Sequence, residues 1–247
     1  ATIDYQQILK LSFVFDFVES KKENLVIWDA DTVILKKIDF FKNEYSIKYA
    51  TLFEFHKHYF KTNEGIVGKN PNYFISSLTQ FIGITNYEYK FLMQNILKVN
   101  PDIKKDKTSF FLSKIILNNI FKNHKIYNGS LFSEYELIGI SNYALKKEKQ
   151  IPLFTLRTGL DGKLTKGQSI IAKLMGVMHV TYEHSYLDKY SQGMLDRKQS
   201  LRRFFVIIIK EFIKFNLRNL RHNFNFYYSL IRVDINLNNN IQYYTLL

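Results

Sequence analysis

A short apolar run, residues 25–28, leads directly into two aspartates, Asp29 and Asp31. A run that is apolar at every position is typical of a strand buried on both faces, as in a parallel sheet covered by helices. Ligand-binding groups in such sheets gather just beyond the carboxyl ends of the strands. The sequence therefore predicts an α/β fold in which both aspartates belong to a ligand site.

Helical periodicity surrounds this predicted strand. The apolar spacing predicts helices over 4–20, 86–98, 108–122 and 132–147. Residues 33–41 are expected to be extended or in a turn, 152–158 to form a strand and 159–162 a turn, while 163–196 gives no clear assignment. We expect one mixed α/β domain over 1–195 and a basic, amphipathic helical extension over 196–247.

The predicted extension has two chemically different sides. At about 100° per residue, one narrow stripe carries the apolar side chains Leu201, Phe205, Ile208, Phe212 and Phe215. The opposite side carries the basic side chains Arg203, Lys210, Lys214 and Arg221. This pattern is typical of a helix packed on a domain with a solvated basic face, or of a helix lying on an anionic membrane surface.

The formal net charge of +13 is concentrated in the C-terminal part of the chain. Residues 1–100 carry 12 basic and 11 acidic side chains, whereas 196–247 carry 9 and 3. Such a basic surface suits nucleic acid, anionic lipid or a phosphate-bearing small molecule. Aromatic residues alternate with lysines mainly in the nearly neutral part, which argues against a nucleic-acid partner. The absence of cysteine excludes disulfides, thiolate metal sites and cysteine nucleophiles.

Two enzyme chemistries use an apolar strand followed by Asp-x-Asp. In glycosyl transfer, the carboxylates hold a divalent cation that neutralises charge on the departing nucleoside diphosphate. In phosphatases of the haloacid dehalogenase type, the first aspartate is the nucleophile and the second is the acid, which residues 29–33 also fit. Those phosphatases need an adjacent acidic pair downstream, and no such pair follows Asp31. The non-catalytic alternative is a turn in which the aspartates cap the next element.

Three further segments accompany the aspartates. They are Gln6-Gln7-Ile-Leu-Lys10, Glu54-Phe-His56-Lys-His58-Tyr59-Phe60 and Phe132-Ser-Glu134-Tyr-Glu136-Leu-Ile138-Gly139. In this order, with Trp28-Asp-Ala-Asp-Thr32 between the first two, they resemble a bacterial family of nucleotide-diphospho-sugar glycosyltransferases. The resemblance covers about residues 5–145 and implies a GT-A fold, a mixed sheet flanked by helices. One departure is Ile138, where the family usually has tyrosine.

The resemblance implies roles on the donor side of a transferase site. Asp31 is the expected main ligand of Mn²⁺ or Mg²⁺, and Asp29 is expected to bind the metal or the donor's ribose. Gln7 and Lys10 are expected beside the donor phosphates, with Lys10 supplying positive charge. A C-terminal histidine is expected to reach the metal or the diphosphate, and His184 ranks slightly ahead of His179.

The resemblance also implies roles on the acceptor side. If transfer inverts the anomeric centre, Glu134 or Glu136 would be the general base that deprotonates the acceptor hydroxyl. The alternative for either glutamate is a charge matched to the dipole of its helix. His56 and His58, which would share one face of a strand, are expected to line the acceptor pocket.

The N-terminus departs from the family pattern. In GT-A enzymes, the chain before the Gln-Gln…Lys segment supplies the first βα units, which hold the nucleobase, and almost nothing precedes that segment here. We therefore expect a fragment, a second chain that completes the donor site, or a protein that has lost donor binding.

The implied function is a metal-dependent glycosyltransferase of bacterial surface polysaccharide synthesis, such as that of lipopolysaccharide or capsule. It would take a nucleoside-diphosphate sugar as donor and a glycan or lipid-linked molecule as acceptor. We expect a cytoplasmic location, peripheral on the inner face of the cytoplasmic membrane. The alternatives are the phosphatase, a basic nucleic-acid-binding protein and a non-catalytic scaffold.

Overall fold

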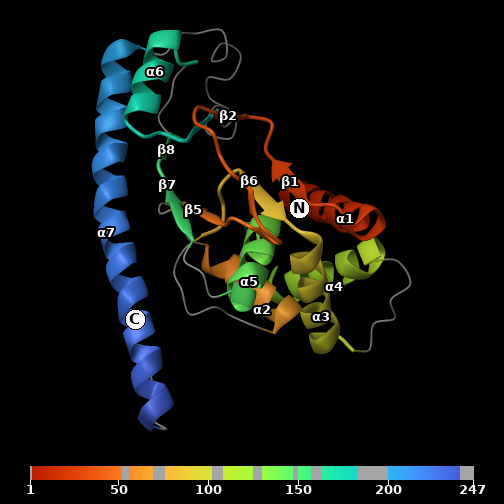
Figure 1. Ribbon diagram of the computed structural model, residues 1–247. Coiled ribbons are helices and arrows are strands. Elements are labelled where there is room, and N and C mark those ends of the chain that lie inside the picture. The colour runs from red at the N-terminus through yellow and green to blue at the C-terminus, as the bar shows by residue number, and fades with distance from the viewer. Residues whose placement is uncertain are drawn as a thin grey trace.

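The computed structural model describes residues 2–51, 56–68, 76–101, 108–124, 130–146, 150–156, 163–182 and 200–239. They form a mixed α/β fold in which helices surround several small sheets (Figure 1). The helices are α1 (Thr2–Lys21), α2 (Lys57–Val67), α3 (Asn86–Val99), α4 (Thr108–His124), α5 (Glu134–Lys146), α6 (Lys166–Leu174) and α7 (Leu201–Asn239). The strands are β1 (Leu25–Trp28), β2 (Thr32–Ile34), β3 (Phe41–Lys42), β4 (Tyr45–Ser46), β5 (Tyr49–Thr51), β6 (Phe81–Ile84), β7 (Ile151–Leu153), β8 (Thr155–Leu156) and β9 (His179–Thr181). Helices α1, α3, α4 and α5 confirm the four helices predicted in residues 1–147.

The strand before the aspartates has an antiparallel neighbour. β1 pairs with β6, with Leu25 opposite Ile84 and Trp28 opposite Phe81. The expected parallel pairing is wrong for β1, and so is burial on both faces, because the Trp28 side chain is 46% exposed. A four-residue apolar pattern does not encode the path of the chain between two strands, and that path sets their relative direction.

The other strands form one three-stranded sheet and two pairs. In the sheet β2-β9-β8, β9 runs antiparallel to β2 and parallel to β8. β5 and β7 are parallel, and β3 and β4 are antiparallel. The predicted strand over 152–158 corresponds to β7 and β8.

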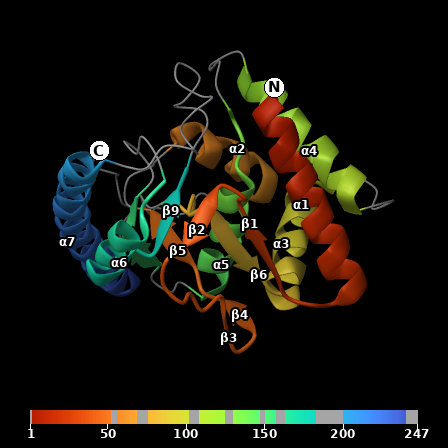
Figure 2. The same ribbon diagram turned by 90° about the horizontal axis from the view of Figure 1, so that it is seen from above.

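The larger hydrophobic core lies among α1 to α5, β1 and β6. The predicted apolar face of α1 is confirmed, since its side chains Ile8, Leu11, Val14, Phe15 and Val18 are all buried. Each such side chain contributes roughly 1.5–3 kcal/mol to folding. α1 packs along α4 on one side of the molecule (Figure 2). This packing fixes the orientation of α1, and with it the positions of Gln7 and Lys10.

A smaller core joins α6 and α7 to β8 and β9. Both α6 and β9 fall in the stretch that gave no assignment. A capping box between Thr165 and Gln168 begins α6. Phe204 and Ile208 of α7 are fully buried in this core. The predicted boundary between 195 and 196 remains a prediction.

The predicted buried stripe of α7 is partly wrong. Leu201 and Phe205 are 59% and 40% exposed, whereas Phe204, outside the predicted stripe, is buried. Apolar side chains occur around more than half of this helix, so the wheel alone does not decide which of them face the core. In Figure 1, α7 runs down one side of the molecule with α6 against its N-terminal half.

Candidate functional site

Lys10 connects three segments that lie far apart in the sequence. Its helix, α1, contacts both β1 and α5. The Lys10 ammonium forms an ion pair and a hydrogen bond with Asp29 Oδ1, and its Nζ lies 3.5 Å from Glu134 Oε1. The same Nζ lies 5.7 Å from the centre of the Tyr135 ring, within cation–π range. We call Gln7, Lys10, Asp29, Asp31, Glu134 and Tyr135 the Lys10 cluster.

The charged groups of the Lys10 cluster differ in exposure. The side chains of Lys10 and Asp29 are 28% and 21% exposed, whereas that of Glu134 is 1% exposed. Burial raises the pKa of Glu134 to about 7, although the Lys10 charge opposes this shift. Burial alone would lower the pKa of Lys10, but the carboxylates of Asp29 and Glu134 outweigh it and the pKa is raised. The cluster therefore faces solvent through Lys10 and Asp29, with Glu134 behind them.

Several buried polar atoms of the cluster have no hydrogen-bond partner among the described residues. They are Oε1 of Gln7, both carboxylate oxygens of Glu134 and the hydroxyl of Tyr135. Gln7 precedes Lys10 by three residues on α1, so the two side chains lie on one face of the helix. Because buried polar groups are normally hydrogen-bonded, this concentration of unpartnered atoms indicates a place for a polar ligand or water.

The loop after β1 presents both aspartates. Thr32 N donates to Asp29 O at 3.1 Å, and Tyr182 N donates to Asp31 O at 3.0 Å. Both aspartates are partly exposed. Burial raises the pKa of the Tyr135 hydroxyl, and the carboxylates of Asp29 and Asp31 raise it further. Because both carboxylates raise the pKa of the Tyr135 hydroxyl, both lie close to it.

Two residues beside the aspartates were not singled out in the sequence. The Trp28 indole is half exposed, and its Nε1 donates to Thr32 O at 3.2 Å. Gln80 is buried and its φ is 66°. Its backbone carbonyl accepts a hydrogen bond from Asp29 N at 2.9 Å. A non-glycine residue in this left-handed region costs about 1–2 kcal/mol, and such residues concentrate at functional sites. Trp28 could have been noticed beside the motif, whereas nothing in the local sequence marks Gln80.

Glu136 has a separate set of partners. Its carboxylate accepts hydrogen bonds from Ser76 Oγ at 2.5 Å and from Ser77 N at 3.1 Å. Burial raises the pKa of Glu136 to about 7, although these hydrogen bonds oppose the shift. Residues two apart on a helix point about 200° apart, so Glu134 and Glu136 cannot share a face of α5. Of the two candidate bases, Glu134 is the one that contacts the Lys10 cluster.

The candidate histidines His56 and His58 lie at the start of a helix. His56 is the N-cap residue of α2 and His58 lies in its first turn, so the expected strand is wrong. Backbone positions two apart share a face in a strand but not in a helix. The His56 ring packs 4.9 Å from the Tyr59 ring. Burial lowers the pKa of His56, and nearby His58 lowers it further.

Of the two C-terminal histidine candidates, His179 lies within the described residues and His184 does not. His179 is buried on β9, with its ring 5.4 Å from that of Phe81 and its Nδ1 3.3 Å from Thr181 Oγ1. His184 lies outside the described residues, as do Glu54 and the predicted turn over 159–162.

The aspartates can be compared with the needs of a divalent cation. The described part of the chain holds no group of three or more histidine, aspartate or glutamate side chains arranged for a metal ion. Mg²⁺ is commonly held by one or two carboxylates together with substrate phosphates. The carboxylate oxygens of Asp29 and Asp31 are of the chemical type that such a cation uses together with a diphosphate.

The chain matches no family model, no curated protein and no solved structure. The residues of the Lys10 cluster and their surroundings therefore carry the functional argument.

Proposed function

We propose that this chain is a metal-dependent glycosyltransferase of the GT-A type, which transfers a sugar from a nucleoside-diphosphate sugar to a glycan or lipid-linked acceptor. The observation that carries the proposal is the contact of Lys10 with Asp29 and Glu134. These residues come from three of the four segments on which the sequence resemblance rests. The unpartnered buried polar atoms of Gln7, Glu134 and Tyr135 add support, because they lie in one cluster where a polar ligand could pair with them.

The exposed members of the Lys10 cluster, and Trp28 beside them, each have a role in this proposal. Asp29 and Asp31 would hold Mn²⁺ or Mg²⁺, and the cation would supply positive charge for the diphosphate of the donor. The Lys10 ammonium supplies a second positive charge toward the same phosphates. The exposed Trp28 indole offers a flat apolar surface on which a sugar or base ring can stack.

Glu134 acts as a positioning residue in this proposal. Its carboxylate is buried behind Lys10 and lies 3.5 Å from the Lys10 ammonium. It therefore holds the ammonium between two carboxylates, that of Asp29 in the loop after β1 and that of Glu134 on α5. Glu134→Gln should raise the KM for the donor and leave kcat less affected. An unchanged KM with loss of kcat would instead favour the general-base role.

Metal-dependent nucleotide binding tests the proposal directly. The melting temperature is measured with UDP, GDP, ADP and CMP, each with Mn²⁺ and then with excess chelator. We expect one nucleoside diphosphate at 100 times its Kd to stabilise the protein by roughly 2.7 kcal/mol, which raises the melting temperature by about 5–11 °C. The stabilisation should need metal and should disappear in Asp31→Asn.

The matched control is Asp39→Asn. Asp39 is exposed and pairs only with exposed Lys37 among the salt bridges of the described residues, at 3.3 Å. This variant should retain the full nucleotide effect. No stabilisation by any nucleotide, or equal loss in Asp31→Asn and Asp39→Asn, would contradict the proposal. Metal-dependent hydrolysis of p-nitrophenyl phosphate that requires Asp29 would favour the phosphatase alternative.

A further inference from the structure

Helix α7 has a second apolar side in addition to the one that faces the core. Toward the core, Phe204 and Ile208 are fully buried, and the Phe215 ring stacks 5.3 Å from that of Phe154. Elsewhere on α7, large apolar side chains are between 40% and 68% exposed. We call these the outer stripe: Phe205, Val206, Ile209, Ile213, Leu217 and Leu220.

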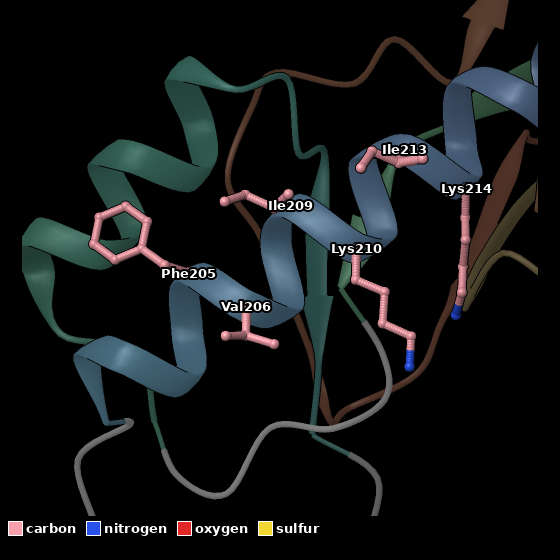
Figure 3. A pocket seen from close by; sticks show the side chains of 6 residues that line it. All are labelled: Phe205, Val206, Ile209, Lys210, Ile213 and Lys214. Atoms are coloured by element: carbon pink, nitrogen blue, oxygen red, sulfur yellow. The ribbon is translucent and has the colours of Figure 1, made fainter.

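Basic side chains border the outer stripe. Lys210 and Lys214 extend on the same side of α7 as Val206, next to a shallow hollow lined also by Phe205, Ile209 and Ile213 (Figure 3). Arg203 and Arg221 precede Lys210 and follow Lys214 by seven residues, so all four lie along one edge of the helix. We call these four residues the basic row.

The charge of this segment is almost entirely positive. Residues 201–221 hold six basic side chains and one acidic side chain, Glu211. Glu211 already accepts a hydrogen bond from Lys214 at 2.7 Å. The outer stripe therefore lies beside a segment whose formal charge is +5, six basic side chains less one acidic side chain.

We propose that the outer stripe and the basic row bind the surface of an anionic lipid bilayer, with α7 lying in the plane of the membrane. An interfacial helix buries an apolar face at the boundary of headgroups and acyl chains while basic side chains contact anionic headgroups. Among the described helices, none is long and apolar enough to cross a bilayer. This inference does not depend on the proposed transferase activity.

Charge also distinguishes a membrane from a second copy of this chain. Two α7 helices packed through their outer stripes would bring two basic rows close together. Residues 201–221 offer only Glu211 to offset that repulsion. An anionic bilayer instead supplies negative charge along the whole row, so charge complementarity favours lipid.

Vesicle flotation of the full chain tests this inference. The probes are vesicles of phosphatidylcholine alone and of phosphatidylcholine with 30% phosphatidylglycerol (roughly the anionic content needed for a strong surface potential). We expect flotation with the anionic vesicles at low salt, weaker flotation at high salt, and little with phosphatidylcholine alone. Absence of flotation with anionic vesicles at low salt would overturn the inference.

Two kinds of variant separate the apolar and electrostatic contributions. Ile209→Ser with Ile213→Ser should reduce the partition coefficient at least about tenfold. Lys210→Gln with Arg221→Gln should reduce it about thirtyfold at low salt and much less at high salt. All four side chains are outside the buried core of α7, so the melting temperature should change little.

The matched control lies on the opposite side of the molecule. Leu117 and Phe121 of α4 are 40% and 67% exposed, and α4 and α7 lie on opposite sides of the sheets (Figure 2). Leu117→Ser with Phe121→Ser should leave flotation unchanged. Equal losses in the control and in the α7 variants would overturn the assignment to α7. A dimer that the Ile209 and Ile213 changes dissociate, in a protein that binds no vesicles, would assign the stripe to a second copy.

Discussion

Two lysines of this protein each face a buried glutamate, and the two pairs differ in their hydrogen bonding. In the first pair, Lys48 Nζ lies 3.7 Å from Glu88 Oε2 and donates to Gly83 O at 2.5 Å. Glu88 also accepts hydrogen bonds from Ser46 N and Oγ, at 3.0 and 2.8 Å, and from Thr85 N at 2.9 Å. This pair is fully buried and joins β4 and β5 to the start of α3.

The second pair, Lys10 and Glu134, lacks such support. Lys10 is partly exposed, and the Glu134 carboxylate accepts no hydrogen bond of ordinary geometry from the described residues. Both pairs contain opposite charges at similar separations, so distance alone does not distinguish them. The number of hydrogen bonds that the carboxylate accepts does distinguish them, and the weaker support of Glu134 agrees with the ligand site proposed around Lys10.

The largest expected effect comes from breaking the fully bonded pair. Lys48→Met should lower the free energy of unfolding by about 3–5 kcal/mol, because it leaves a buried carboxylate without its cation. Lys37→Met is the control, since Lys37 pairs with Asp39 on the exposed surface, where a salt bridge contributes at most about 1 kcal/mol. Urea denaturation at pH 7 measures both. A loss for Lys48→Met no larger than that of the control would show that the pair is not structural.

A pH-dependent effect of intermediate size is expected at Glu136, which has hydrogen bonds but no cation. Burial raises its pKa from 4.5 to about 7 in the folded protein, so between these values the folded state binds more protons than the unfolded state. This contribution to stability is present below pH 4.5 and is lost as the pH rises through 7. Glu136→Gln should therefore become more stable than the original protein by up to about 3 kcal/mol above pH 7.

The measurement for Glu136 is the difference in unfolding free energy between the variant and the original protein from pH 4.5 to 8. The partners of the Glu136 carboxylate, Ser76 and Ser77, do not titrate in this range, and the shift has no contribution from a charged neighbour. Glu23→Gln, at an exposed position, should give a difference that does not change with pH. A flat difference for Glu136→Gln as well would show that the carboxyl is not perturbed.

The smallest expected effect compares two tyrosine hydroxyls. That of Tyr135 is buried without a partner, whereas that of Tyr49 donates to Asp39 O at 2.8 Å. Tyr135→Phe should leave the melting temperature unchanged or raise it, because removing an unpartnered polar group is neutral or stabilising by up to about 1 kcal/mol. Tyr49→Phe should lower stability by about 0.5 kcal/mol. A larger loss of stability in Tyr135→Phe than in Tyr49→Phe would show that the Tyr135 hydroxyl contributes to folding stability.

The sequence predicted four of the five helices of the larger core, α1, α3, α4 and α5, because their apolar spacing is regular. The sequence did not predict that Lys10, Asp29 and Glu134 meet. The family resemblance put Lys10 and Asp29 on the donor side and Glu134 on the acceptor side, and no spacing rule relates positions over 100 residues apart.

The errors concern features that local pattern does not contain. The direction of the strand opposite β1 depends on the path of the intervening chain, and the orientation of α7 depends on where β8 and α6 lie. His56 and His58 were expected to share one face of a strand because they are two residues apart, but Phe60, Asn63 and Val67 are buried at the spacing of a helix. The positive φ of Gln80 is not marked by any feature of the local sequence.

The length of α7 also determines how the molecule rotates in solution. Its 39 residues form a rod of about 58 Å at 1.5 Å per residue. A compact chain of 247 residues has a radius of gyration of about 18 Å. Because the rod exceeds three times that radius, tumbling is faster about the helix axis than across it. Nuclear spin relaxation of α7 amides, which lie nearly parallel to this axis, should therefore differ systematically from that of amides in the small sheets.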